Sequence, residues 1–175
     1  MIAYLDSSAL VKLYIQEPGS SEVRALINEA RIVATSRVAC VEVRAGFARK
    51  LREGGLLQEE HSQVVGNFKE DWEKYFVVEV SEDVARLGGR LVEKHPLRGF
   101  DAIHLASALL LKERANLEVF FSCFDKRLKS RRPGRGVDHT LMILRRFNGK
   151  AGHEESIARV HPRPHVPRNR EGILC

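Results

Sequence analysis

The sequence predicts an α/β fold in which a parallel sheet is sandwiched between helices. Two observations predict it: short apolar runs with strand character, and longer helical stretches that separate them. Parallel pairing is expected because a crossover helix returns the chain to the same end of the sheet. With 175 residues and 43% hydrophobic composition, the chain can form one domain with a sizeable core. The predicted strands are Ile2–Leu5, Ile32–Ala34, Phe76–Val80 and Val119–Cys123.

The first predicted strand leads directly into an acidic residue and a helix. Asp6 follows the apolar run Ile2–Leu5, and either Ser7 or Ser8 can cap a helix over Ala9–Ile15. Asp6 is therefore not needed as the cap, and its carboxylate is available for another role. The alternative is a simple turn residue at a strand-to-helix junction.

The second predicted strand is followed by a helix that carries Glu42. Ser36 is the expected cap of this helix. Glu42 is expected to point in the same direction as nearby apolar side chains, although a salt bridge with a neighbouring arginine is the alternative. Four positions share one face at helical spacing: Val38, Val41, Glu42 and Ala45.

The middle of the chain continues the alternation of strands and helices. An amphipathic helix is predicted over 59–75, and another over 83–94 after the third strand. A later helix begins near Asp101 and is apolar almost all round, which is typical of a buried helix. Asp101 can act as a cap at its amino end. His104, one turn on, can reach the same site, but taken alone it is better explained as a core histidine.

Asp125 follows the last predicted strand, Val119–Cys123, as Asp6 follows the first. In open α/β sheets, ligands bind outside the carboxyl ends of the strands. Asp6 and Asp125 are therefore expected to meet there, together with Glu42 and Asp101 from the following helices. Burying an unpaired carboxylate costs several kcal/mol, so converging acids need cations or protons. The pattern predicts a metal site.

The predicted donors favour a hard cation. An all-oxygen cluster without cysteine is how Mg²⁺ or Mn²⁺ is usually held, and it argues against zinc. Two such ions about 4 Å apart can activate water and stabilise the leaving oxygen of a phosphodiester. The sequence lacks the phosphate-binding, dinucleotide-binding, serine-hydrolase and C-x-x-C motifs. Hydrolysis of RNA fits the predicted site best.

Four segments in residues 1–128 closely resemble the PIN-domain ribonucleases, and among them the VapC-type toxins. They are LDSSALVKLY, VACVEVRAGFARK, RGFDAIHLASAL and FSCFDKRL. The resemblance implies that Asp6, Glu42, Asp101 and Asp125 hold one or two Mg²⁺ or Mn²⁺ ions or lie beside the ligands, and that Ser122 assists. It also implies an endoribonuclease that cuts RNA, forms a homodimer and is inhibited by a cognate VapB-type antitoxin.

The last part of the chain departs from this family. Residues 1–128 carry 18 basic and 19 acidic residues, whereas residues 129–175 carry 11 and 4, with four of the six prolines. We expect a PIN-like nuclease domain over 1–128 and an irregular basic tail over 129–175, with a short helix at 137–147. A shifted reading frame or an unusual extension would explain why this tail differs from the family. The functional alternative is that the tail is an arm that binds nucleic acid.

The unusual tail also suggests a second possible function for the protein. The family usually ends in a short closing strand, which this tail is not expected to supply. A noncatalytic RNA-binding or regulatory PIN-like domain is therefore the alternative to the nuclease. The sequence has no run of 18 apolar residues and no signal-peptide pattern, so we expect a cytoplasmic protein without a membrane partner.

Overall fold

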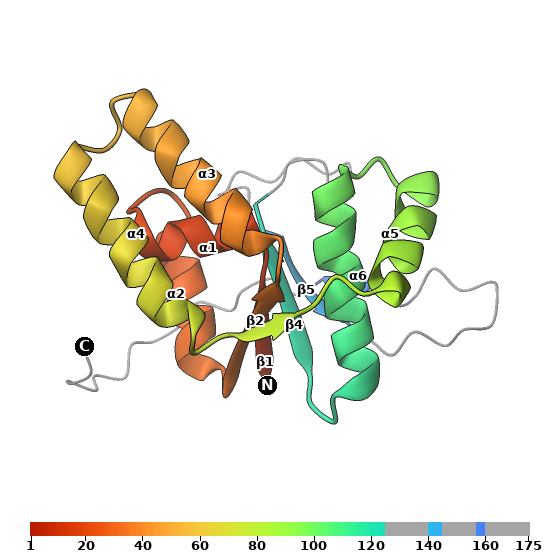
Figure 1. Ribbon diagram of the computed structural model, residues 1–175. Helices are drawn as coiled ribbons and strands as arrows, with labels where there is room; N and C mark the ends of the chain where they lie inside the picture. The colour runs from red at the N-terminus through yellow and green to blue at the C-terminus, as the bar shows by residue number, and fades with distance from the viewer. Residues whose placement is uncertain (125–139, 145–156, 160–175) are drawn as a thin grey trace.

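The computed structural model describes residues 1–124 and the backbone of residues 140–144 and 157–159 (Figure 1). In these residues, six strands form one sheet and six helices accompany it. The strands are β1 (Ile2–Leu5), β2 (Ile32–Ser36), β3 (Phe76–Val78), β4 (Val119–Cys123), β5 (Thr140–Leu144) and β6 (Ile157–Arg159). The helices are α1 (Ser7–Tyr14), α2 (Ser20–Glu29), α3 (Ala39–Arg52), α4 (Gln58–Trp72), α5 (Glu82–Lys94) and α6 (Gly99–Arg114).

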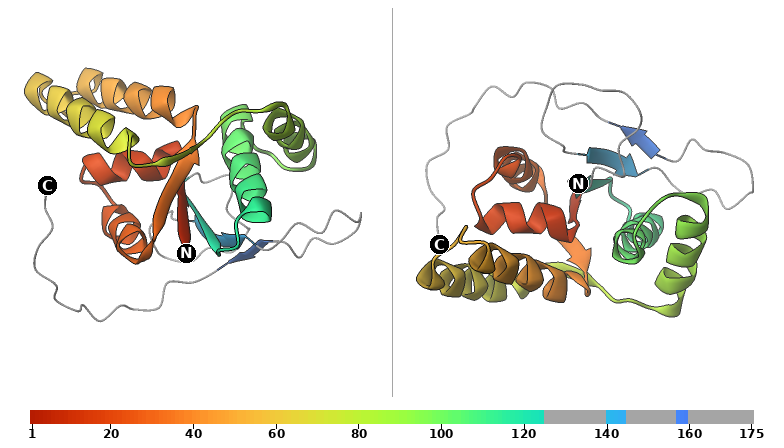
Figure 2. Two further views of the ribbon diagram at one scale, coloured as in Figure 1. Left: turned by 60° about the horizontal axis from the view of Figure 1, so that its bottom comes forward. Right: turned by 90° about the horizontal axis from the view of Figure 1, so that it is seen from above.

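The sheet has the strand order β3-β2-β1-β4-β5-β6, and its first four strands are parallel. Ile2 pairs with both Ile32 and Val119, so β1 is central to the parallel part. Helices α1 to α4 pack on one face of the sheet, and α5 and α6 pack on the other (Figures 1 and 2). The predicted parallel sheet sandwiched by helices is confirmed.

Strand β1 supplies side chains to two separate cores. Ile2 and Tyr4 pack with α5 and α6, whereas Ala3 and Leu5 pack with α1 to α4. Successive side chains of a strand point to opposite faces, and here both faces are covered. All four residues are at most 3% exposed. The apolar run therefore fixes β1 at the centre of the molecule, with Asp6 at its carboxyl end.

Helix α6 is buried almost all round, as its composition predicts. Ala102 and residues 104–109 are buried between the sheet and α5, including the polar side chains of His104 and Ser107. Within residues 1–124, none of the helices has both the length and the apolar character needed to cross a membrane.

The structure predicted for the carboxyl-terminal region is wrong in two respects. A helix was expected over 137–147, but the structure has strand β5 at Thr140–Leu144. The closing strand expected to be missing is present, because β5 runs antiparallel to β4 along its whole length. The short strand β6 then pairs with β5. A short apolar run such as that at 141–144 fits a strand or a helix, and the open edge of β4 decides between them here.

The predictions for the start of α3 and for its buried face are also wrong. Ser36 is the last residue of β2, and Val38, which makes no side-chain cap, precedes the helix. Val41 is 73% exposed and Ala45 is exposed, so Glu42 does not share a buried face with them. The buried positions of α3 are instead Ala39, Val43 and Phe47. Helix α2, between α1 and β2, was not predicted.

Candidate active site

Asp6 lies at the carboxyl end of β1 and caps helix α1. Its Oδ1 accepts hydrogen bonds from the backbone N–H of Ala9 at 2.8 Å and from Ser8 Oγ at 2.7 Å. The expectation that a serine caps this helix is therefore wrong, because the acid itself does so. Asp6 is only 6% exposed. Burial raises the pKa of its carboxyl group, and the nearby Glu42 adds to the rise, although His104 and the hydrogen bonds oppose it.

Glu42 lies in the first turn of α3 and points toward α1 and α6. Its Oε2 accepts hydrogen bonds from Ser7 Oγ at 2.6 Å and from His104 Nε2 at 2.9 Å. Burial opposes ionisation, but these two hydrogen bonds hold the pKa of Glu42 below its ordinary value. In the described part of the chain its side-chain partners are Ser7 and His104, and the salt bridge with a neighbouring arginine does not form there.

His104 joins the acidic residues to the interior of the sheet. Its side chain is 2% exposed, and Nε2 lies 3.0 Å from Ser7 Oγ. Its other ring nitrogen, Nδ1, lies 3.4 Å from the Tyr4 hydroxyl. His104 is therefore buried as a core histidine would be, but it is also part of the polar cluster around Glu42.

Asp101 stands one helical turn before His104, at the start of α6. Its Oδ2 accepts a hydrogen bond from the backbone N–H of Arg98 at 3.2 Å, which is a capping interaction. Residues three apart lie on the same face of a helix, so Asp101 is on the face that carries His104 to Glu42. The first turns of α3 and α6 lie at the edge where the parallel strands end (Figure 1).

The end of strand β4 lies directly beside Asp6. The backbone N–H of Asp6 donates to the carbonyl oxygen of Ser122 at 3.1 Å, and the N–H of Phe124 donates to Ser8 Oγ at 2.8 Å. Ser122 is fully buried. The predicted ligand Asp125 lies outside the described residues, so its place in the site stays a prediction.

The described donors suit a hard cation, although they do not form a complete metal site. No group of three His, Cys, Asp or Glu side chains in the described ranges is placed to hold a metal ion. The donors that would contribute are carboxylate oxygens, which Mg²⁺ and Mn²⁺ prefer. Burial raises the pKa of the Asp6 carboxyl group in spite of its two hydrogen bonds, and a bound cation would favour the charged form. The four-acid metal site remains a prediction.

Two residues of the cluster were missed as site residues. Ser7 was expected as a possible helix cap, but it contacts Glu42 and His104 instead. Tyr4 was expected only as a strand residue. The position of Tyr4 in an apolar strand could have indicated a buried polar contact, because a buried tyrosine hydroxyl usually has a hydrogen-bond partner.

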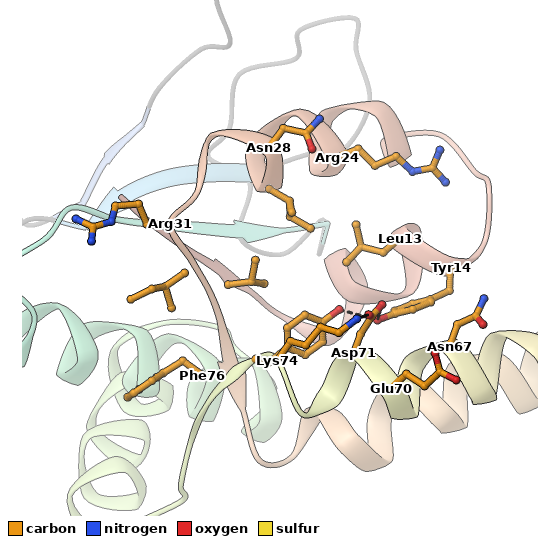
Figure 3. Close-up of a pocket in the computed structure, with 14 residues that line it drawn as sticks. Leu13, Tyr14, Arg24, Asn28, Arg31, Asn67, Glu70, Asp71, Lys74 and Phe76 are labelled. Atoms are coloured by element: carbon orange, nitrogen blue, oxygen red, sulfur yellow. Dashed lines mark hydrogen bonds and ion pairs between the residues drawn. The ribbon is translucent and has the colours of Figure 1, made fainter. Parts of the chain in front are cut away.

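A hollow in the surface lies away from these acidic residues. It has a volume of about 1100 Å³ and is bordered by α1, α2, α4 and the first residues of β2 and β3 (Figure 3). Within it, the Tyr14 hydroxyl lies 2.6 Å from that of Tyr75 and donates to Asp71 at 3.1 Å. Asp6, Glu42 and His104 do not line it.

Comparisons with known proteins identify the family. The PIN domain family matches residues 3–132. Two Mycobacterium tuberculosis proteins, Ribonuclease VapC45 of strain CDC 1551 / Oshkosh and Ribonuclease VapC49 of strain ATCC 25618 / H37Rv, are each 35% identical over 127 residues. Each alignment covers 73% of this chain and 86% of the relative. A toxin-antitoxin complex from Klebsiella pneumoniae aligns with a TM-score of 0.49 and 21% identity, over 67% of this chain and 82% of that one. The chain belongs to the PIN-domain family, as its sequence motifs predicted.

Proposed function

We propose that this protein is a Mg²⁺- or Mn²⁺-dependent endoribonuclease that hydrolyses RNA phosphodiesters and acts as the toxin of a toxin–antitoxin pair. The two mycobacterial relatives, named as VapC ribonucleases, support the activity and the biological class. One structural observation carries the assignment to a site. Asp6 is a buried carboxyl group at the carboxyl edge of a parallel sheet, where ligands of α/β folds bind, and Glu42 is near enough for the two charges to interact.

The proposed ligands are Asp6, Glu42, Asp101 and Asp125. When bound, a divalent ion of this kind supplies an activated water and stabilises the leaving oxygen of a phosphodiester. The protein contributes the placement of its carboxylates. The cap of α1 and Ser8 fix Oδ1 of Asp6, and Ser7 with His104 fixes Oε2 of Glu42. Held in this way, the side chains lose little further conformational freedom when they bind.

The proposed partners follow from the same charges. RNA is the substrate, and a VapB-type antitoxin is the inhibitor. A buried carboxylate cluster is a ready site for a guanidinium group, so we expect the antitoxin to place an arginine near Asp6 and Glu42. We also propose a homodimer.

One argument for the alternative, a noncatalytic RNA-binding or regulatory domain, no longer applies. It rested on a carboxyl-terminal region without a closing strand, and strand β5 occupies that place beside β4. The nuclease is therefore the better supported of the two functions.

The test is cleavage of labelled RNA by the purified protein with Mg²⁺, with Mn²⁺ and with excess EDTA. We expect cleavage only with a divalent ion, and loss of at least 100-fold in rate for Asp6→Asn and Asp101→Asn, on the order expected for removing a needed charge. Asp83→Asn is the control, because this exposed residue of α5 makes only surface ion pairs, which contribute little. Unchanged cleavage in EDTA, or by Asp101→Asn, would refute the metal-dependent nuclease.

A further inference from the structure

The buried ring of His104 places two polar nitrogen atoms in a largely apolar part of helix α6, and both need partners. Its neighbours Ala102, Leu105 and Ala106 are at most 2% exposed. Buried polar groups are nearly always hydrogen-bonded, because an unpaired one costs about 1–3 kcal/mol. Both nitrogen atoms of His104 have polar partners: Nδ1 faces Tyr4, and Nε2 faces Glu42 and Ser7.

The Nε2 atom of His104 carries a hydrogen atom. The Ser7 hydroxyl donates its one hydrogen atom to Glu42 Oε2 at 2.6 Å, so toward any other group Ser7 Oγ can only accept. The His104 Nε2 atom lies 3.0 Å from this Ser7 oxygen and 2.9 Å from Glu42 Oε2. It faces two acceptor oxygens and is therefore placed as the donor.

The Nδ1 atom of a neutral His104 ring is then an acceptor, and Tyr4 is placed to donate to it. Tyr4 is fully buried, and burial raises the pKa of its phenol far above the ordinary value, so the hydroxyl keeps its proton. The Tyr4 ring is stacked on Phe121, with centroids 5.6 Å apart and an angle of 21° between the planes. Because a hydroxyl can donate or accept, the acceptors at Nε2 select the tautomer, and the Tyr4 hydroxyl supports it by donating to Nδ1.

The two hydrogen bonds to Glu42 fall on one of its oxygen atoms. Within the described residues, Ser7 and His104 both donate to Oε2, which leaves Oε1 available. A glutamate side chain has three rotatable bonds, and fixing it has an entropic cost of about 1–2 kcal/mol. His104 and Ser7 offset this cost before any ion is bound.

We propose that His104 is a positioning residue that holds Glu42 ready for a divalent ion, and that the Tyr4 hydroxyl supports the required ring tautomer by donating to Nδ1. This inference rests on the proposed function for the role of Glu42 as a ligand. Partners of this kind behind a metal ligand typically change metal affinity or activity by 10–100-fold when they are removed. The Tyr4, His104 and Glu42 side chains thus form one hydrogen-bonded line from the core of the sheet to the acidic edge.

A matched pair of substitutions at His104 tests the positioning role. The side-chain amide of glutamine can place a donor where Nε2 lies, whereas that of asparagine places it near Nδ1 and does not reach Glu42. We expect His104→Asn to weaken Mn²⁺ binding, measured by calorimetry, by about 10-fold or more. His104→Gln should bind Mn²⁺ within about 3-fold of the parent protein. Circular dichroism melts of all variants confirm that they are folded.

The tautomer is tested in the protein without metal. In ¹⁵N-histidine NMR spectra, the signal lost in His104→Gln is that of His104, and we expect the Nε2–H tautomer. Tyr4→Phe should shift this signal toward a mixture of tautomers and weaken Mn²⁺ binding by several-fold. Tyr75→Phe is the control, because it removes a hydroxyl that is bonded to Tyr14 in the remote hollow. It should lower stability without changing either measurement.

The results separate this inference from the proposed function. If His104→Asn binds Mn²⁺ as tightly as the parent, or if the parent shows the Nδ1–H tautomer, the inference is wrong even where RNA cleavage is metal-dependent. If the tautomer and Mn²⁺ effects hold but RNA is never cleaved, the positioning role stands and the nuclease assignment fails.

Discussion

The backbone N–H of Phe124 donates a hydrogen bond to Ser8 Oγ at 2.8 Å, across 116 positions of the sequence. The same hydroxyl donates to Asp6 Oδ1 at 2.7 Å. Ser8 therefore ties the carboxylate at the end of β1 to the backbone at the end of β4. Phe124 is the residue before Asp125, another predicted ligand, so Ser8 contacts both Asp6 and the chain that leads to Asp125 in the sequence.

We predict that Ser8→Ala lowers the free energy of unfolding by about 2 kcal/mol, because it removes one hydrogen bond to a carboxylate and leaves an N–H without its partner. It should also weaken Mn²⁺ binding by about 10-fold. Ser21→Ala is the matched control, since among the described residues the side chain of this exposed serine bonds only to the neighbouring Glu22. Its stability should change by no more than about 0.5 kcal/mol. Urea unfolding and Mn²⁺ titration measure both effects, and equal behaviour of the two variants would contradict the linking role of Ser8.

Gly19 allows the Phe124 ring to pack against the start of α2. It has φ +98°, and a Cβ atom there would overlap Cε1 of Phe124. We predict that Gly19→Ala is destabilising for two reasons, an unfavourable φ and the displaced ring. Gly54→Ala separates them, because Gly54 has φ +74° and no described atom within 4 Å of the added carbon.

Gly54→Ala should cost about 1–2 kcal/mol from its backbone conformation. Gly19→Ala should cost about 1–3 kcal/mol more from the clash, and it alone should weaken Mn²⁺ binding, since it moves the residue before Asp125. Melting curves and metal titrations of both variants decide this. Equal effects at the two glycines would show that Phe124 does not transmit the change.

The fold could be predicted well because its signals are local. Apolar runs such as Ile2–Leu5 and Val119–Cys123 form strands where they were expected. The error at 137–147 has a physical cause, because a short apolar run in basic surroundings carries no periodicity that separates helix from strand. Only the unpaired edge of β4, which is a tertiary feature, favours β5 there.

The location of the candidate site could be predicted from the sequence, but the hydrogen bonds between its residues could not. The position of Asp6 after a strand gave its location, yet its role as the cap of α1 depends on a rotamer that the sequence does not specify. The partners of Glu42 come from residues 35 and 62 positions away. Such contacts are set by how α1, α3 and α6 pack, and one sequence alone does not contain them.

Glu17 provides a pH-dependent prediction away from the acidic edge. It accepts hydrogen bonds from the Lys12 and Lys50 ammonium groups at 2.6 and 3.0 Å. Burial opposes ionisation, but the two lysines hold its pKa below the ordinary 4.5. A carboxyl group whose folded pKa is lowered stabilises the fold above its unfolded pKa and loses this effect as the pH falls through the folded value.

We therefore expect Glu17→Gln to be less stable than the parent at pH 7, with a difference that shrinks below about pH 4.5. Unfolding by urea at several pH values measures it. Glu93→Gln is the control, because Glu93 is an exposed residue of α5. A difference between parent and Glu17→Gln that stays constant down to pH 3 would show that the lysines do not act through the charge.

Two truncations test the carboxyl-terminal region. A protein ending at residue 147 keeps β5, and one ending at residue 139 removes it and opens the edge of β4. We expect the longer protein to bind Mn²⁺ like the full chain, while its RNA binding depends less on salt, because basic residues beyond 147 are removed. The shorter protein should aggregate or melt at a lower temperature. Loss of Mn²⁺ affinity in the longer protein would mean that residues after 147 belong to the site.

Asp6→Asn is predicted to separate stability from metal binding. Burial raises the pKa of Asp6, so its charge destabilises the metal-free fold at neutral pH, and asparagine removes that charge. Asparagine also caps helices as well as aspartate does, so the hydrogen bond from Ala9 can be kept. The metal-free variant should therefore melt at or above the temperature of the parent, by about 2–4 °C for each kcal/mol gained.

Added Mn²⁺ should reverse this order. A ligand that binds only the folded state raises the melting temperature in proportion to the logarithm of its concentration over Kd. The parent and the Asp83→Asn control should both gain stability with Mn²⁺, while Asp6→Asn should gain little. Asp6→Ala, which also loses the cap, should be less stable than Asp6→Asn by about 1 kcal/mol. If Asp6→Asn gained as much stability from Mn²⁺ as the parent, Asp6 would be a helix cap and not a metal ligand.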